Sequence, residues 1–179
     1  MKKTLSFWQM LGFVFTGIMG VILHFLFDWA NQSIILSPFS AVNESIWEHM
    51  KLLFFPMFVF SIIESIFIGK DYKSFWCAKV MGIVSGMALI PVLYYSINGK
   101  FGPTPDFVNI AIFYVAAAIS YILETSLLKK DSLDCLSPKA AIVILVLIAV
   151  IFAILTFTPP KIPLFQDPIT KTYGYFQII

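Results

Sequence analysis

The most constraining feature of the sequence is its series of long apolar runs that carry almost no charge. Residues 4–27 contain no charged side chain, and a helix needs only about 20 such residues to cross the hydrocarbon core of a membrane. The chain of 179 residues is 59% hydrophobic and 12% charged, whereas a soluble domain is about one quarter charged. A fold of this size in water could not bury so much apolar surface, so the sequence predicts a membrane protein.

Five apolar segments separated by turn residues are long enough to span a bilayer. In lipid, the backbone polar groups of each segment must be satisfied within the protein, which favours helices. The predicted transmembrane helices cover about residues 6–30, 44–69, 75–97, 106–128 and 140–157. We therefore expect an all-α fold, a polytopic transmembrane bundle of about five helices that forms a single membrane domain over residues 1–179.

The lysines predict how the bundle is oriented in the cell (plasma) membrane. With the N-terminus inside, eight lysines lie on the inner side and four on the outer side, with Lys79 among the former and Lys51 among the latter. The C-terminus is then outside, and residues 158–179 form an extracytoplasmic tail that either caps the bundle or hangs flexibly at the headgroups. Cys77 and Cys135 fall near the cytoplasmic side, so we expect free thiols. The absence of arginine argues against a nucleic-acid partner.

The densest polar stretch opens the second predicted helix. Asn43 is a good N-cap there, and ionisable side chains follow it within two turns. On a helix that begins at Glu44, the side chains of Glu44, Glu48 and Lys51 share one face. Such groups are costly in lipid unless they face protein or water. We therefore predict a polar site in the outer half of the bundle, with the candidates His24, Asp28, Asn43, Glu44, Ser45, Trp47, Glu48, His49 and Lys51.

The only two histidines of the chain are predicted to lie at matched depth. His24 precedes the end of the first helix and His49 follows the start of the second, each roughly 8–9 Å below the outer surface at about 1.5 Å per residue. Together with Glu48 they could bind a divalent metal such as zinc, with one open position for water. A proton relay, a hydrogen-bonded tie between helices, and ligand recognition without metal are the alternatives.

Two further carboxylates, Glu64 and Glu124, are secondary candidates near the inner ends of the second and fourth helices. If buried, they could carry protons or pair with Lys79. We expect instead that they extend to the cytoplasmic headgroups. The spacing of Gly82 and Gly86 indicates a close contact between helices.

Two motifs and the C-terminal region resemble a known family. The run SAVNESIWEHMKLLFFP (residues 40–56), the upstream HFLFDW (residues 24–29) and the ending FTPPKIPLFQDP with Tyr173-Gly174 look like a family of small bacterial membrane proteins, mainly from Firmicutes, that is classed as a domain of unknown function. The resemblance covers nearly the full chain. It implies an integral membrane protein, and it supplies no activity and no catalytic residues.

Three functions are compatible with these features. The first is a membrane-embedded enzyme, such as a metal-assisted hydrolase of a lipid or envelope substrate, which requires His24 and His49 to converge with a carboxylate. The second is a small-molecule binding or transport component with an outward cavity lined by Trp29, Trp47, Glu44 and Glu48. The third is an accessory partner of another membrane protein, with a closed polar network and no pocket.

Overall fold

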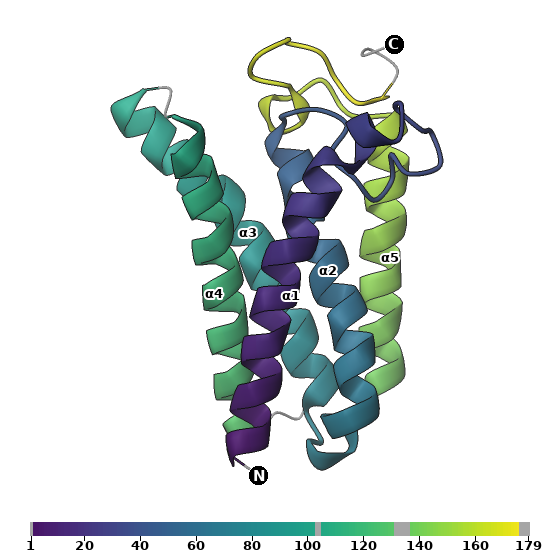
Figure 1. The fold of residues 1–179 in the computed structure, drawn as a ribbon, viewed down its shortest axis with the longest axis vertical. Helices are drawn as coiled ribbons and strands as arrows, with labels where there is room; N and C mark the ends of the chain where they lie inside the picture. The colour runs from purple at the N-terminus through teal and green to yellow at the C-terminus, as the bar shows by residue number, and fades with distance from the viewer. Residues whose placement is uncertain (1, 103–104, 131–136, 176–179) are drawn as a thin grey trace.

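The computed structural model describes residues 2–102, 105–130 and 137–175 and has five long helices (Figure 1). No β-strand occurs in these residues, and each of the five helices is long and apolar enough to cross a membrane. The predicted all-α, multi-pass membrane bundle is therefore confirmed. The long helices are α1 (Lys2–Trp29), α2 (Ile46–Ile68), α3 (Phe75–Phe101), α4 (Asp106–Lys130) and α5 (Pro138–Phe157), and two short 3-10 helices are η1 (Gly69–Asp71) and η2 (Pro163–Phe165).

Helix α2 lies at the centre of the bundle. In its most apolar segment 56% of the residues are buried, whereas no other helix exceeds 33%. It packs against α1, α3, α4 and α5, and its Leu53, Phe54 and Met57 form the middle of the main apolar core. The other helices expose isoleucine, valine and phenylalanine side chains on their outer faces, as expected for helices in contact with lipid.

The start of α2 differs from the prediction. Ser45, not Asn43, is the N-cap, and its hydroxyl accepts a hydrogen bond from the backbone N–H of Glu48. Asn43 lies in the preceding turn, where its side-chain oxygen accepts a hydrogen bond from the Ser45 N–H at 2.9 Å. The helix begins at Ile46 because the Asn43 turn directs the chain away from helical geometry before the serine cap. Glu44 is therefore in the loop and not on the helix.

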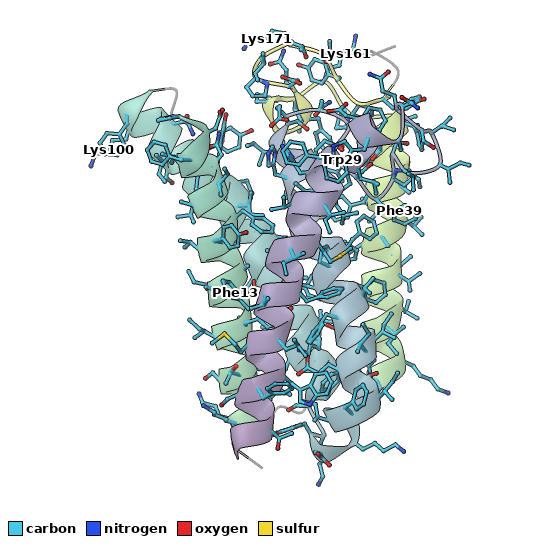
Figure 2. All side chains as sticks on the ribbon, in the orientation of Figure 1. Phe13, Trp29, Phe39, Lys100, Lys161 and Lys171 are labelled. Atoms are coloured by element: carbon cyan, nitrogen blue, oxygen red, sulfur yellow. The ribbon has the colours of Figure 1, made fainter. Side chains whose placement is uncertain are left out.

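The bundle has two distinct ends, which we call the N-terminal end and the tail end. The N-terminus lies at one end, and the segment after α5 lies at the other (Figure 1). Lys100, Lys161 and Lys171 all lie at the tail end (Figure 2). Lys51 and Lys79, which the lysine count assigned to the outer and inner surfaces, are instead buried inside the bundle. Both have carboxylate partners there. Ion pairing offsets the free-energy cost of burying an ammonium group.

The described part of the tail caps the bundle. Phe165 packs against Trp47 with ring centroids 4.6 Å apart, and Tyr175 packs against Phe27 at 5.9 Å. The Tyr175 hydroxyl also donates a hydrogen bond to the carbonyl of Gln32 at 3.2 Å. Of the two arrangements considered for the tail, residues 158–175 adopt the ordered one.

The expectation of a free thiol at Cys77 is wrong, because this cysteine is disulfide-bonded. Cys135 lies outside the described residues. The expectation rested on a cytoplasmic placement deduced from lysine counts, not on the geometry around the thiol.

Candidate functional site

The two histidines lie side by side near the tail end. His24 is on the last part of α1 and His49 is on the first turn of α2, and their ring centroids are 5.6 Å apart. Successive helices α1 and α2 pack against each other, so the end of one lies beside the start of the next. Both side chains are partly exposed, at 27% and 21%, which leaves them accessible to a ligand.

The carboxylate that joins the histidines is that of Glu44, not Glu48. One oxygen of Glu44 is 3.7 Å from His24 Nε2, and the other is 3.5 Å from His49 Nε2. One ligand atom from each of the three residues lies within 4.8 Å of the other two. The structure thus brings together a His-Glu-His cluster at the position predicted for a metal site, with a different carboxylate.

Hydrogen bonding orients the ring of His49. Its Nδ1 lies 2.9 Å from the carbonyl oxygen of Ser45, one helical turn earlier. A carbonyl only accepts, so Nδ1 carries a proton and donates, and Nε2, on the side of Glu44, is the ring atom left for a metal. This is the arrangement of histidine ligands in metal sites, where the second ring nitrogen is held by a carbonyl or carboxylate.

The tail fixes the loop that carries Glu44. The backbone N–H of Glu44 donates to Asp167 Oδ2 at 3.2 Å, and the other Asp167 oxygen accepts from the N–H groups of Ile169 and Thr170 at 2.7 and 3.0 Å. Burial alone would raise the pKa of Asp167, but these three backbone donors stabilise its charge and lower the pKa below its usual value of 3.8. An ionised Asp167 therefore holds the loop and the tail together.

Glu48 and Lys51 form a separate, buried ion pair. Their charged groups are 2.5 Å apart, and both side chains are almost fully buried. Lys51 also donates to the Ser37 carbonyl and the Thr156 hydroxyl, each at 2.9 Å, and Glu48 accepts from the Val42 N–H at 3.0 Å. The pair ties the loop after α1, the start of α2 and the end of α5 to one another.

Two other predicted site residues do not join the His-Glu-His cluster. Trp47 packs against Phe152 of α5 and Phe165 of η2, with ring centroids 4.6 Å apart in both pairs. Asp28 is an exposed residue near the end of α1. Neither residue belongs to the His-Glu-His cluster.

A cavity of about 240 Å³ adjoins the cluster. Glu44 and His49 form one wall, and α3 and α4 form the opposite wall, while Pro168 and Ile169 of the tail close part of its edge. In Figure 1 the tops of α3 and α4 lean away from α1 at this end. The cavity combines apolar and polar lining residues, which are Ile46, Ile90, Tyr94, Asn98, Asp106, Asn109, Ile112 and Phe113.

The two secondary candidates meet in a second polar cluster toward the N-terminal end. Lys79 Nζ of α3 lies 2.5 Å from a carboxylate oxygen of Glu64 on α2 and 2.5 Å from one of Glu124 on α4. All three side chains are buried, with at most 1% exposed. The expected extension of the carboxylates to the headgroups is therefore wrong, because a shared ammonium group inside the bundle holds both of them.

Some features of these sites were not predicted from the sequence. Ser45-Ile-Trp-Glu48 matches the capping-box pattern, which places the helix start at Ile46 and releases Glu44 into the loop. That signal could have identified Glu44 as the carboxylate near the histidines. No comparable pattern marks Asn98, Asp106 and Asn109 of the cavity, or Asp167 of the tail, because their positions depend on how distant segments pack.

Comparison with known proteins adds a family and no activity. A family model described as that of a family of unknown function matches residues 1–175. No curated protein matches the chain, and no solved structure does. The geometry of the site is therefore the basis for a functional proposal.

Proposed function

The chain belongs to DUF6512, a family of unknown function, and from the geometry of its polar site we propose that it binds a divalent metal through His24, Glu44 and His49. Zinc suits these ligands best, since imidazole nitrogen with carboxylate oxygen is a common donor set for it. The observation that carries the proposal is the convergence of three ligand atoms within 4.8 Å, with the His49 ring already held by Ser45.

The spacing of the ligand atoms fits a metal. Ligands of tetrahedral zinc lie about 2.0–2.1 Å from the ion and therefore roughly 3.3 Å from one another. The two Glu44–histidine distances, 3.7 and 3.5 Å, are close to that value. These two distances involve different oxygens of Glu44, so its carboxylate must rotate for the three residues to coordinate one ion.

Three protein ligands leave the fourth position of a tetrahedral ion for water or substrate, which is the pattern of catalytic zinc sites. Zinc in such a site lowers the pKa of its bound water to about 7 and polarises a carbonyl or phosphoryl oxygen. The adjoining cavity of about 240 Å³ provides space for the reacting group. These features support metal-assisted hydrolysis near the membrane surface as the reaction class.

A second candidate is a small-molecule binding or transport component. In its favour, the cavity has polar lining residues besides Glu44 and His49, namely Asn98, Asp106 and Asn109. The sequence predicted a cavity lined by Trp29, Trp47, Glu44 and Glu48. Of these four residues only Glu44 lines it. An accessory protein without a ligand predicts no pocket, so the cavity argues against that third alternative.

Metal analysis of the purified full chain tests the proposal. We expect about one zinc ion per chain in the wild type, loss of the ion in His24→Ala and His49→Ala, and strongly weakened binding in Glu44→Gln. Asp28→Asn is the matched control, because Asp28 is an exposed carboxylate one turn from His24. Glu48→Gln distinguishes the two carboxylates, since a correctly folded Glu48 variant should keep its metal.

The proposal fails if the wild type binds no divalent metal, or if a variant carrying both His24→Ala and His49→Ala binds as much as the wild type. The reaction class is tested separately in lipid nanodiscs. Products of lipid hydrolysis, measured by mass spectrometry, should disappear after chelation and return when zinc is restored. A metal-bound protein that binds a ligand in the cavity without turnover would instead support the second candidate.

A further inference from the structure

A second polar cluster inside the bundle lies apart from the proposed metal site. It joins four helices, because Gln9 of α1 donates a hydrogen bond to Glu64 at 2.8 Å, and Lys79 of α3 links Glu64 to Glu124 of α4. The three ionisable side chains have at most 1% of their surface exposed, and Gln9 has 5%. We call Glu64, Lys79 and Glu124 the triad.

The triad has more carboxylates than cations. The groups that face it from α1 and α4 are Gln9, which has no charge, and Tyr121, whose hydroxyl is hydrogen-bonded to Thr16 at 2.9 Å. Helix α5 has Lys139 at its start and no other titratable residue. With both carboxylates ionised, the triad would carry one uncompensated negative charge away from water. Such a charge is so costly that a buried group takes up a proton instead.

The two carboxylates differ in their surroundings. Glu64 Oε1 accepts a hydrogen bond from Gln9 Nε2, and Glu64 Oε2 is in ion-pair contact with Lys79 Nζ without a hydrogen bond to it. Glu124 Oε2 accepts a hydrogen bond from Lys79 Nζ at 2.5 Å. Glu124 Oε1 is buried and has no hydrogen-bond partner among the described residues. It lies directly over Gly82, where an added Cβ atom would be 2.6 Å from it. An ionised oxygen without a donor loses more energy on burial than a neutral one.

We propose that the triad is a proton-binding site and that Glu124 carries one exchangeable proton at neutral pH. Lys79 and Glu64 form the neutral ion pair beside it. The bound proton comes from bulk water and adds to a carboxylate oxygen, so no other reactant is needed. This function is separate from metal binding at the tail end.

A second, wide-open cavity on the surface offers a route for the proton. It has a volume of about 630 Å³ and lies between α1 and α4, and its lining includes Ser6, Ser126 and Lys129 near the N-terminal end of the bundle. Gln9 and Thr125 also line it, and the Thr125 hydroxyl donates to Gln9 Oε1 at 3.4 Å. Gln9 therefore stands between this cavity and the carboxylate of Glu64.

Infrared spectroscopy of the full chain in lipid nanodiscs tests the protonation state. A protonated carboxyl group gives a C=O stretch that is separate from the bands of ionised carboxylates. We expect this band in the wild type at neutral pH. Glu124→Gln and Glu64→Gln should each remove it, because either change leaves one carboxylate and one ammonium group. Lys79→Met should increase the band to about twice its intensity, since both carboxylates then need a proton.

Glu48→Gln is the matched control, because Glu48 has its own lysine partner and the band should not change. A wild-type protein without the band overturns the proposal and needs no variant for that conclusion. Retention of the full band in both the Glu64 and the Glu124 variants would also overturn it.

Deuterium exchange tests whether the proton reaches water. Transfer to D₂O should shift the wild-type band to lower frequency, and the shift should be at least several-fold slower in Gln9→Leu. Met10→Leu, which changes an apolar residue lining the same cavity, should exchange at the wild-type rate. A wild-type band that never shifts means a permanently buried proton and contradicts the exchangeable site. Equal rates in the wild type and Gln9→Leu contradict the route through Gln9.

Discussion

At the scale of single residues, the number of partners decides what a buried charge does. The Lys51 ammonium group has three donors, and the structure provides three acceptors in Glu48, the Ser37 carbonyl and the Thr156 hydroxyl. This pair is balanced and fully satisfied. The triad contains the same residue types in a different ratio, with two carboxylates for one ammonium group. The first arrangement stabilises the fold, and the second can bind a proton.

Removing Lys51 should be strongly destabilising. Lys51→Met leaves Glu48 as an unpaired buried carboxylate, and breaking such a pair costs about 3–5 kcal/mol. The free energy of unfolding in detergent, measured with a denaturant, should fall by about that amount. The double variant Glu48→Gln with Lys51→Met should recover part of the loss, because no buried charge remains.

Lys100→Met is the control for this measurement, since Lys100 is exposed at the end of α3 (Figure 2). Its effect should stay within about 0.5 kcal/mol. If Lys51→Met unfolds no more easily than Lys100→Met, then the buried pair does not hold the tail end together.

At the scale of helices, glycine lets α3 and α4 approach closely. A Cβ atom on Gly86 would collide with the Ser120 hydroxyl of α4 and would be 2.8 Å from a methyl group of Leu53. Gly82 lies in the same way under the side chain of Glu124. The predicted close contact at these two glycines therefore places α4, and with it Glu124, within reach of Lys79.

Gly86→Ala should separate these helices at a measurable cost. Overpacking a filled interface destabilises by about 1–3 kcal/mol, which thermal unfolding of the purified protein should detect as a lower midpoint. Adding Ser120→Ala to this variant removes the colliding oxygen and should restore part of the stability.

Gly99→Ala provides the matched control on the same helix. Nothing lies within 4 Å of an added Cβ there, and alanine is a better helix former than glycine by about 1 kcal/mol. Its midpoint should stay the same or rise. Equal losses in the Gly86 and Gly99 variants would show that the effect does not come from the α3–α4 contact.

At the scale of the whole molecule, the tail connects the ends of several helices with the proposed metal site. Its aromatic residues pack against Trp47 and Phe27, and its Asp167 accepts the hydrogen bond of the Glu44 backbone. A segment more than a hundred residues away in sequence thereby positions the ligand carboxylate. Loss of the tail should affect metal binding even though no tail residue belongs to the His-Glu-His cluster.

The contribution of Asp167 should depend on pH in a defined direction. Its pKa is lower in the folded protein than its usual 3.8, so the ionised form stabilises the docked tail. That stabilisation is present above the usual pKa and is lost as the pH falls below it and through the folded value. Hydrogen exchange of the Glu44, Ile169 and Thr170 amides should therefore be slow near neutral pH, after correction for the intrinsic exchange rate, and lose its protection only in strong acid.

Asp167→Asn should abolish this pH dependence. Exchange at the same amides should be faster than in the wild type at neutral pH, and zinc affinity should fall several-fold, because an uncharged amide binds the three donors less strongly. Asp71→Asn, at the opposite end of the bundle, should change neither measurement. Full protection in the Asp167 variant would contradict the role of the carboxylate in docking the tail.

The sequence by itself determined the helical membrane bundle, since charge-free runs of spanning length have few alternatives in lipid. It also indicated that His24 and His49 fall near the same end of consecutive helices. These inferences need only helical rise, chain order and the cost of polar groups in lipid, and all three can be read along the chain.

Only the tertiary structure decided which carboxylate accompanies the histidines and where the other charges go. A helix start two residues later than expected moves Glu44 into a loop, and the direction of that loop depends on a hydrogen bond to Asp167. The pairing of Glu64 and Glu124 with Lys79 depends on which helices are neighbours. Local sequence patterns do not specify these contacts, because each joins segments that only packing brings together.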